Sequence, residues 1–181
     1  GVCKNCKYEY PLKITALSGT FVVTSNGTNI RNQPYSTGTA KIVRTAKKNA
    51  ALTVVKKTTN AANQVWYQLS DGNWVYSANV AQRFTVKYNA NGGTSAPASK
   101  TYLKGNSFTV STVKPVRTGY VFQGWSTSKT ATKISYKAGS TYTFSKDMTL
   151  YAVWKTCTHS YSGGVCKNCK YEYPLKITAL S

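Results

Sequence analysis

Residues 148–154 read Met-Thr-Leu-Tyr-Ala-Val-Trp, a run in which large apolar side chains recur at every second position. Successive side chains of a β-strand point to opposite faces, so this run predicts a strand with one buried face. The face expected in the core carries Met148, Leu150, Ala152 and Trp154. The opposite face carries Thr149, Tyr151 and Val153.

The residues before this run, back to position 83, predict more of the same small β domain. Phe84, Val86 and Tyr88 alternate with polar residues, and the turn-forming Asn91-Gly92-Gly93 follows them. Residues 117–125, Arg-Thr-Gly-Tyr-Val-Phe-Gln-Gly-Trp, combine glycines at turn or bulge positions with three aromatic rings spaced for packing. We therefore expect residues 83–155 to fold as one unit.

Four motifs of this block occur in an order that is similar to a known family. They are Tyr-Asn-Ala-Asn-Gly-Gly at 88–93, Pro-Val-Arg-Thr-Gly-Tyr at 115–120, Phe-Gln-Gly-Trp at 122–125 and Thr-Leu-Tyr-Ala-Val-Trp at 149–154. They resemble the Listeria-Bacteroides repeat, the family of the B-repeats in internalin-type surface proteins. The resemblance implies a compact β-grasp-like module of extracellular, often wall-anchored adhesins and spacers, with no catalytic activity.

Residues 12–82 predict a second small β domain, a barrel or a sandwich, because short β-prone runs alternate with turns and helical periodicity is absent. Asn26-Gly27 and Asp71-Gly72 supply turn chemistry. The expected strands include residues 21–23, 42–44, 52–55, 65–69 and 74–76.

This first block resembles the bacterial SH3-type domain through Asn-Ile-Arg-Asn-Gln-Pro at 29–34, Val-Trp-Tyr at 65–67 and Asp-Gly-Asn-Trp-Val-Tyr at 71–76. The resemblance implies a small barrel, some members of which bind peptidoglycan peptides in a shallow aromatic groove. Trp66 and Val75 are expected in the core, since a domain of this size needs large apolar residues there. The candidate ligand-binding residues are Arg31, Asn32, Tyr35, Tyr67, Trp74 and Tyr76.

The chain is strongly basic, with 24 Lys and Arg against 4 Asp and Glu and a formal net charge of +20. This charge favours an anionic partner such as a cell-wall polymer, a glycan or nucleic acid. Nucleic acid is disfavoured, because only four of the basic residues are arginine, the side chain best suited to reading bases. The alternative is that lysine keeps a repetitive protein in solution.

The first 18 residues, GVCKNCKYEYPLKITALS, occur again as residues 164–181. A period of 163 residues is far longer than a solenoid repeat, so each repeat must contain whole domains, like beads on a string. We expect a fragment of a tandem array, with an artificial duplication as the alternative. The predicted division is the second half of a truncated Cys/His joint at 1–11, the SH3-type domain at 12–82, the repeat domain at 83–155, a Cys/His joint at 156–174 and the start of the next repeat at 175–181.

The cysteines lie only near the two ends of the chain. Cys157, His159, Cys166 and Cys169 offer four soft ligands, enough for one tetrahedral, structural Zn²⁺, with neighbouring lysines expected to lower the pKa values of the thiols. Disulfide bonds are the alternative in an extracellular protein. Cys3 and Cys6 have no Cys-x-His pair before them, so we expect them to be unliganded, joined to each other or matched with another molecule.

An enzyme is not expected. The only acids are Glu9, Asp71, Asp147 and Glu172, too few and too far apart in the sequence for paired-carboxylate catalysis, and nothing orients Cys157 and His159 as nucleophile and base. No apolar run approaches the length of a membrane-spanning helix.

The leading hypothesis is a secreted segment at the cell surface or cell wall of a Gram-positive-type bacterium. It would bind peptidoglycan or an anionic wall polymer weakly and serve adhesion by multivalency, next to neighbouring repeats of the same protein. A purely structural spacer that displays other domains is the first alternative, and nonspecific binding of polyanions or nucleic acid is the second.

Overall fold

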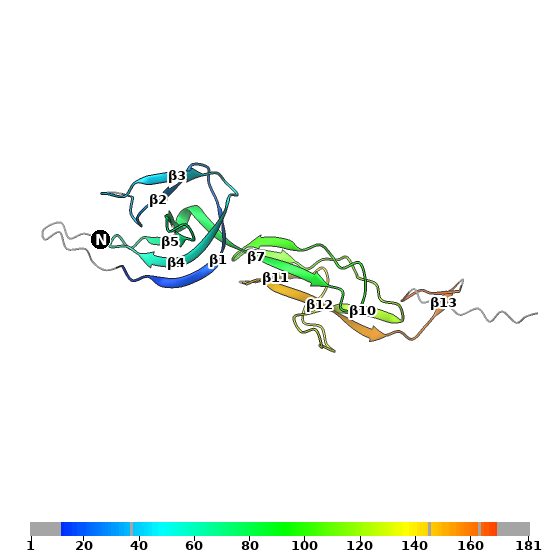
Figure 1. Ribbon diagram of the computed structural model, residues 1–181. Coiled ribbons are helices and arrows are strands. Elements are labelled where there is room, and N and C mark those ends of the chain that lie inside the picture. Colours follow the sequence, from blue (N-terminus) through cyan, green and yellow to red (C-terminus); the bar gives the residue numbers. More distant parts are fainter. Residues whose placement is uncertain (1–11, 37, 145, 163, 170–181) are drawn as a thin grey trace, which may run out of the picture. The chain divides into compact units, whose positions relative to one another are not determined.

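A computed structural model describes residues 12–36, 38–144, 146–162 and 164–169, which form strands joined by turns (Figure 1). These residues contain one short 3-10 helix, η1 (Ser77–Asn79), and no α-helix, so the all-β prediction is confirmed. The described chain also has no helix that is long and apolar enough to cross a membrane. The predicted segments 1–11, with Cys3 and Cys6, 170–174 and 175–181 lie outside the described residues.

The chain divides into two compact units, Gly1–Phe84 and Thr85–Ser181. The division falls within strand β7 (Val80–Asn89), whose first residues pair in the first unit and whose last residues pair in the second. The described part of the predicted Cys/His joint, 156–162 and 164–169, is grouped with the second unit.

The first unit is an antiparallel sheet in the order β7-β1-β4-β5-β6-β2-β3. Its strands are β1 (Thr15–Val23), β2 (Thr28–Arg31), β3 (Ile42–Ala46), β4 (Ala51–Thr59), β5 (Val65–Leu69) and β6 (Trp74–Tyr76). Each of the five runs expected to form strands lies within one of them. The core consists of Phe21, Val23, Ile30, Ala46, Leu52, Val54, Leu69, Val75 and Val80.

The two predicted turns of this unit are present. Gly27 and Gly72 have φ angles of 70° and 84°, a left-handed conformation that glycine adopts without a steric penalty. Asp71 accepts a hydrogen bond from the Asn73 backbone N–H at 3.0 Å and pairs with Arg44 at 2.9 Å. The hydrogen bond from Arg44, followed by those from Asn73, lowers the pKa of Asp71 against the opposing effect of its partial burial.

Strand β3 ends the sheet order and pairs with β2 in the described residues. Its first four residues are exposed on both faces, and the side chains of Ile42 and Val43 are 51% and 52% exposed. The strand therefore presents an open backbone edge together with apolar side chains.

The second unit is built around β12 (Met148–Thr156), which lies parallel to β7 on one side and antiparallel to β10 (Tyr120–Ser126) on the other. Strand β8 (Lys100–Leu103) pairs with β7, and β9 (Ser107–Thr109) pairs with β11 (Thr141–Thr143) in a separate small sheet. Apart from three cysteines, its buried apolar residues are Val86, Phe108, Val110, Trp125, Leu150, Ala152 and Val153.

The turn after β7 is held against the end of β12 by a set of close contacts. The Trp154 indole N–H donates to the carbonyl oxygens of Ala90 and Asn91 at 3.0 and 3.1 Å, and the Asn91 side chain donates to the carbonyl of Ala152 at 3.0 Å. A Cβ atom placed on Gly93 would lie 2.5 Å from the Val116 carbonyl oxygen and 2.7 Å from the Trp154 ring. This approach requires glycine at position 93, and it explains the spacing of the turn and tryptophan motifs.

One expected strand face differs from the structure. Leu150 and Ala152 are fully buried as predicted, but Val153, expected on the opposite face, is only 2% exposed. Val153 pairs with Gly124 beside a bulge in β10, and Ile134 lies where a Gly124 side chain would otherwise be, 2.9 Å from its ideal Cβ position. Directly opposed residues share a face, so Ile134 covers the side of the sheet that holds Val153.

Replacing Gly93 by Ala should lower the free energy of unfolding of the second unit by about 1–3 kcal/mol, because the added methyl group would clash with a backbone carbonyl oxygen, which cannot rotate away as the end of a flexible side chain can. Gly19→Ala is the matched control, since its nearest neighbour at 2.7 Å is the end of the flexible Gln82 side chain. Denaturant unfolding followed by tryptophan fluorescence measures both variants. Equal destabilisation by the two substitutions would contradict the assigned contact.

Candidate metal centre

The first half of the candidate centre extends directly from the central strand of the second unit. Strand β12 ends at Thr156, opposite Tyr120 of β10, and the next residue, Cys157, donates its backbone N–H to the Gly119 carbonyl at 3.0 Å. Val121 packs against the buried cysteines. The position of Cys157 is therefore set by the same strand pairing that forms the core of the unit.

The second half returns by a very short hairpin. Strands β13 (Tyr161–Ser162) and β14 (Val165–Cys166) pair in antiparallel register, and Gly164 has a φ angle of 81° at the reversal. The Lys167 backbone N–H donates to the Ser160 carbonyl at 3.1 Å, and residues 167–169 form a turn. This arrangement brings Cys166 and Cys169 back to the end of β12.

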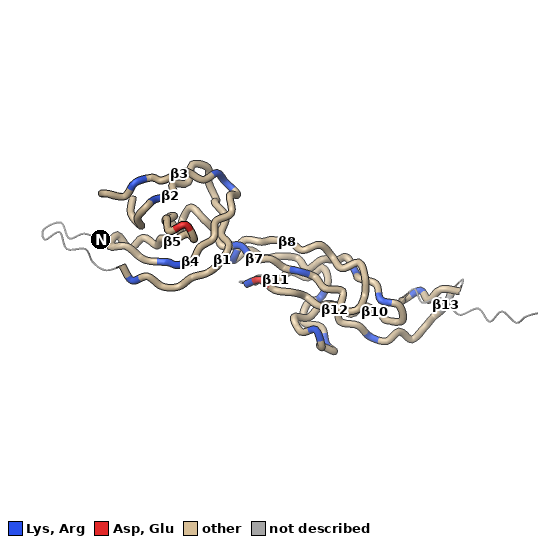
Figure 2. The backbone as a smooth tube through the Cα atoms, in the orientation of Figure 1, with Lys and Arg blue, Asp and Glu red and all other residues tan. Residues whose placement is uncertain are grey.

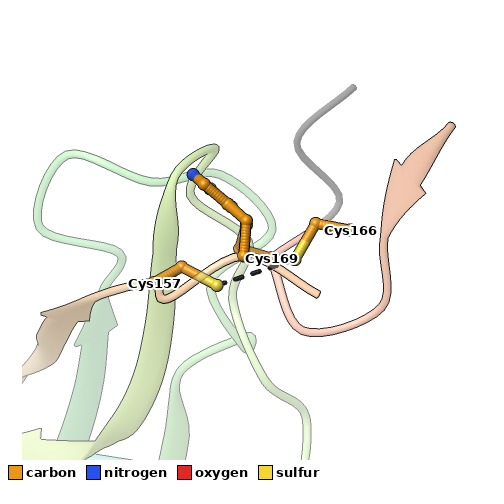
Figure 3. A group of neighbouring side chains, drawn as sticks. Cys157, Cys166 and Cys169 are labelled. Atoms are coloured by element: carbon orange, nitrogen blue, oxygen red, sulfur yellow. Dashed lines mark hydrogen bonds between the residues drawn. The ribbon is translucent and has the colours of Figure 1, made fainter. Parts of the chain in front are cut away.

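The four predicted ligand atoms come together at one point. Those of Cys157, His159, Cys166 and Cys169 all lie within 4.8 Å of one another. The sulfurs of Cys157 and Cys166, 3.6 Å apart, point toward each other (Figure 3), and the Cys169 sulfur lies 3.3 Å from His159 Nδ1. All three sulfur-bearing residues are buried, whereas His159 is exposed at the rim.

These separations fit a tetrahedral metal site better than a disulfide. With Zn–S bonds of about 2.3 Å and Zn–N bonds of about 2.0 Å, tetrahedral geometry places two sulfurs about 3.8 Å apart and a sulfur and a nitrogen about 3.5 Å apart. A disulfide requires a sulfur–sulfur distance of about 2.05 Å. Cys157, Cys166 and Cys169 are all free thiols, so among the described residues the disulfide alternative is not realised.

The pKa values of two of the thiols are shifted in opposite directions. Burial opposes ionisation of Cys166, but hydrogen bonds from His159 and from the backbone N–H groups of Ser160, Asn168 and Cys169 outweigh it and lower its pKa to about 5. Burial, together with the neighbouring thiols Cys169 and Cys166, raises the pKa of Cys157 to about 12. The expectation that lysines would lower the pKa values of the thiols is therefore wrong for Cys157, and for Cys166 the cause is the histidine and the backbone. The lowered pKa of Cys166 favours its thiolate form, which is the form that binds a metal cation.

The candidate ligand residues of the first unit fall on two different faces of its sheet. Arg31 pairs with Trp74, and Tyr76 lies two residues further along the same strand, so these three share one face. Tyr67 lies on the core side, where its ring packs 4.9 Å from that of Phe21.

Several of these candidates already have structural contacts. Trp74 is only 6% exposed, Asn32 accepts a hydrogen bond from the Lys41 backbone N–H at 2.8 Å, and the Arg31 guanidinium donates to the Ala40 carbonyl at 3.5 Å. Tyr35, Tyr67 and Tyr76 are half-buried. Trp66 and Val75, expected in the core, are 3% and 0% exposed.

Sequence reasoning missed Asn60, a buried polar residue that holds the loop carrying Tyr35. Its side chain donates to the Pro34 carbonyl at 3.1 Å and accepts from the backbone N–H groups of Ala62 and Gln64. It also missed the contacts of Gly119 and Val121 with the cysteines. The only signal for these was the presence of a glycine-containing turn in the 115–120 motif, which gives no indication of its distance from Cys157.

Comparisons with known proteins inform the second unit alone. Neither the curated proteins nor the solved structures contain a match to this chain. The candidate metal centre begins at Cys157, four residues beyond the end of the matched segment. Residues 84–153 match the family model of the Listeria-Bacteroides repeat domain, a non-catalytic repeat, and this match indicates a repeat protein of the surface or extracellular type.

Proposed function

We propose that the chain is a non-enzymatic structural segment of a secreted bacterial surface protein, in which Zn²⁺ stabilises the segment that follows strand β12 in each repeat unit. The observation that carries this proposal is the convergence of four Cys and His ligand atoms within 4.8 Å at the end of β12. A spacer that displays other domains needs a connection of fixed conformation between consecutive units, and a turn cross-linked by a metal ion would provide one.

The donor set favours zinc. Three thiols and one imidazole form the Cys₃His combination typical of closed structural zinc sites, in which the protein supplies all four ligands and leaves no position for a substrate. Soft sulfur ligands disfavour calcium and magnesium, which bind oxygen. Loss of the Cys157 proton on binding would accompany metal uptake, because its pKa is raised to about 12.

The segment after β12 has little else to stabilise it. Strands β13 and β14 have two residues each, and a two-stranded hairpin alone is marginal in water even when it is longer. The apolar contact of the cysteines is with Val121. Zinc binding would therefore contribute folding free energy to this segment directly, as in other small metal-dependent folds.

Weak binding of peptidoglycan or an anionic wall polymer by the first unit is a second candidate function. It is favoured by the shared face of Arg31 and Tyr76 on adjacent strands of the first unit, which combines a guanidinium with a partly exposed ring. Repetition would convert a weak contact into avidity. The burial of Trp74 and Trp66 reduces the exposed aromatic surface and makes the spacer the better-supported function.

The distribution of charge disfavours the nucleic-acid alternative. Lys and Arg occur on several strands and turns of each unit (Figure 2), rather than along a single element. A nucleic-acid-binding groove combines a continuous basic stripe with exposed stacking rings. We therefore assign the lysines to attraction toward anionic wall material and to solubility.

The purified chain should contain one zinc ion, measured by mass spectrometry of the metal after exhaustive dialysis. Cys166→Ser should abolish tight zinc binding, because it removes a buried ligand of the cluster. Cys3→Ser alters the same position in the other copy of the duplicated peptide and should leave the metal content unchanged. A metal-free wild-type chain, or equal loss in both variants, would contradict the assignment.

Retention of the chain on purified peptidoglycan at moderate salt tests the second function. Arg31→Gln should weaken retention several-fold, whereas Arg44→Gln removes the same charge from a residue already paired with Asp71 at 2.9 Å and should have a smaller effect. Equal weakening would indicate diffuse charge attraction. Absence of retention for the wild-type chain would rule out wall binding by this segment.

A further inference from the structure

Strand β3 has a neighbour on one side only in the part of the chain that the structure describes. It pairs with β2, and no other described strand lies along its outer side. The backbone N–H and C=O groups on that side therefore have no partner strand. The strand also exposes the apolar side chains of Ile42 and Val43. An extended segment of another chain can join an edge of this kind as an additional strand.

A β-bulge restricts what can join this edge. Ile30 pairs with Arg44 and Arg31 pairs with Ile42, so Val43 is an extra residue on β3. A bulge bends its strand and increases the local twist. The edge strand of a folded domain is held in its own sheet and cannot follow such a bend, whereas a free peptide segment can. The bulge therefore favours an extended peptide over another folded sheet.

Basic side chains lie at both ends of this edge (Figure 2). Lys41 comes directly before β3, and Lys47 and Lys48 follow it directly; all three are exposed. Asp71 is the only acidic residue in the part of the first unit that the structure describes, and it is already paired with Arg44 at 2.9 Å. Within these residues no further carboxylate is available to neutralise the three lysines, so the edge attracts negative charge.

The order of these side chains defines the kind of sequence that fits the edge. Lys41 and Lys47 are six residues apart, which is about 20 Å along an extended strand, and Ile42 and Val43 lie between them. Cross-strand pairs of opposite charge and pairs of β-branched side chains are both favourable. The complementary segment therefore carries carboxylates near its two ends and β-branched residues between them. The equivalent strand of a second copy would bring lysines toward lysines.

We propose that the outer edge of β3 binds a short acidic peptide segment of another protein, which extends the sheet of the first unit by one strand. Backbone hydrogen bonds supply the affinity, and the lysines select acidic sequences and speed the encounter. This function adds a protein partner to the spacer role proposed above, and it does not depend on the zinc centre.

The test uses the full chain and a fluorescent heptapeptide, Glu-Val-Thr-Val-Thr-Val-Glu, with blocked ends. Fluorescence anisotropy should show saturable binding that weakens as salt is added. The same peptide with lysine in place of both glutamates should not bind. A third peptide carries N-methyl groups on the backbone nitrogens of its five central residues. It keeps the charges and side chains but lacks the N–H donors, so its affinity should be at least tenfold lower.

Variants of the chain locate the binding site. Lys47→Gln/Lys48→Gln should weaken binding of the acidic peptide several-fold. Lys56→Gln/Lys57→Gln is the matched control, because it removes the same charge from β4, a strand paired on both sides, and should have a smaller effect. Hydrogen exchange of the unmodified chain should show slower exchange of the β3 backbone amides when the peptide is bound. This measurement requires no substitution and so does not depend on the folding of a variant.

Equal affinity for the N-methylated and unmodified acidic peptides would show that charge alone attracts the ligand, as it would an anionic polymer, and would overturn strand addition. Equal weakening by the two lysine pairs would also contradict a site at β3. Failure of the acidic peptide to bind would remove the proposal altogether.

Discussion

The register of β12 against its two neighbours is the constraint on which the second unit depends. Parallel pairing with β7 and antiparallel pairing with β10 place Leu150 and Ala152 in the core and deliver Thr156 opposite Tyr120. A slip of one residue would exchange the two faces of the strand. It would expose the core residues and turn Cys157 away from Gly119, so the packing of the unit and the position of Cys157 are set by the same hydrogen bonds.

The second unit thus combines a well-packed sheet with a segment that has almost no core of its own. Trp125, Leu150 and Ala152 are completely buried, whereas the segment after Thr156 gathers three small sulfur-bearing side chains against Val121. The sheet provides a rigid base, and the metal would provide the missing stabilisation beyond it. The segment after Thr156 is therefore the part of the unit whose structure is most sensitive to thiol oxidation or to removal of a bound metal. Neither change would disturb the sheet.

Local sequence predicted most of the fold and the composition of the candidate site. Alternation identified the strands around Phe84 and Leu150, glycine and asparagine identified the turns, and the Cys and His spacing identified four residues that the structure brings together. Long-range packing could not be predicted, because the alternation of apolar and polar residues identifies the two faces of a strand but not the distant segments that pack against them. Val153 is buried by a segment that approaches Gly124, and burial among other thiols raises the pKa of Cys157.

The open edge at β3 has a consequence for the self-association of the first unit. Backbone groups on this edge, beside the exposed side chains of Ile42 and Val43, form a template that the equivalent strand of a second molecule could extend. Lys41, Lys47 and Lys48 flank this strand, and the whole chain carries a net charge of +20. Like-charge repulsion between molecules opposes edge-to-edge growth of a cross-β aggregate, so the high lysine content disfavours association through this edge.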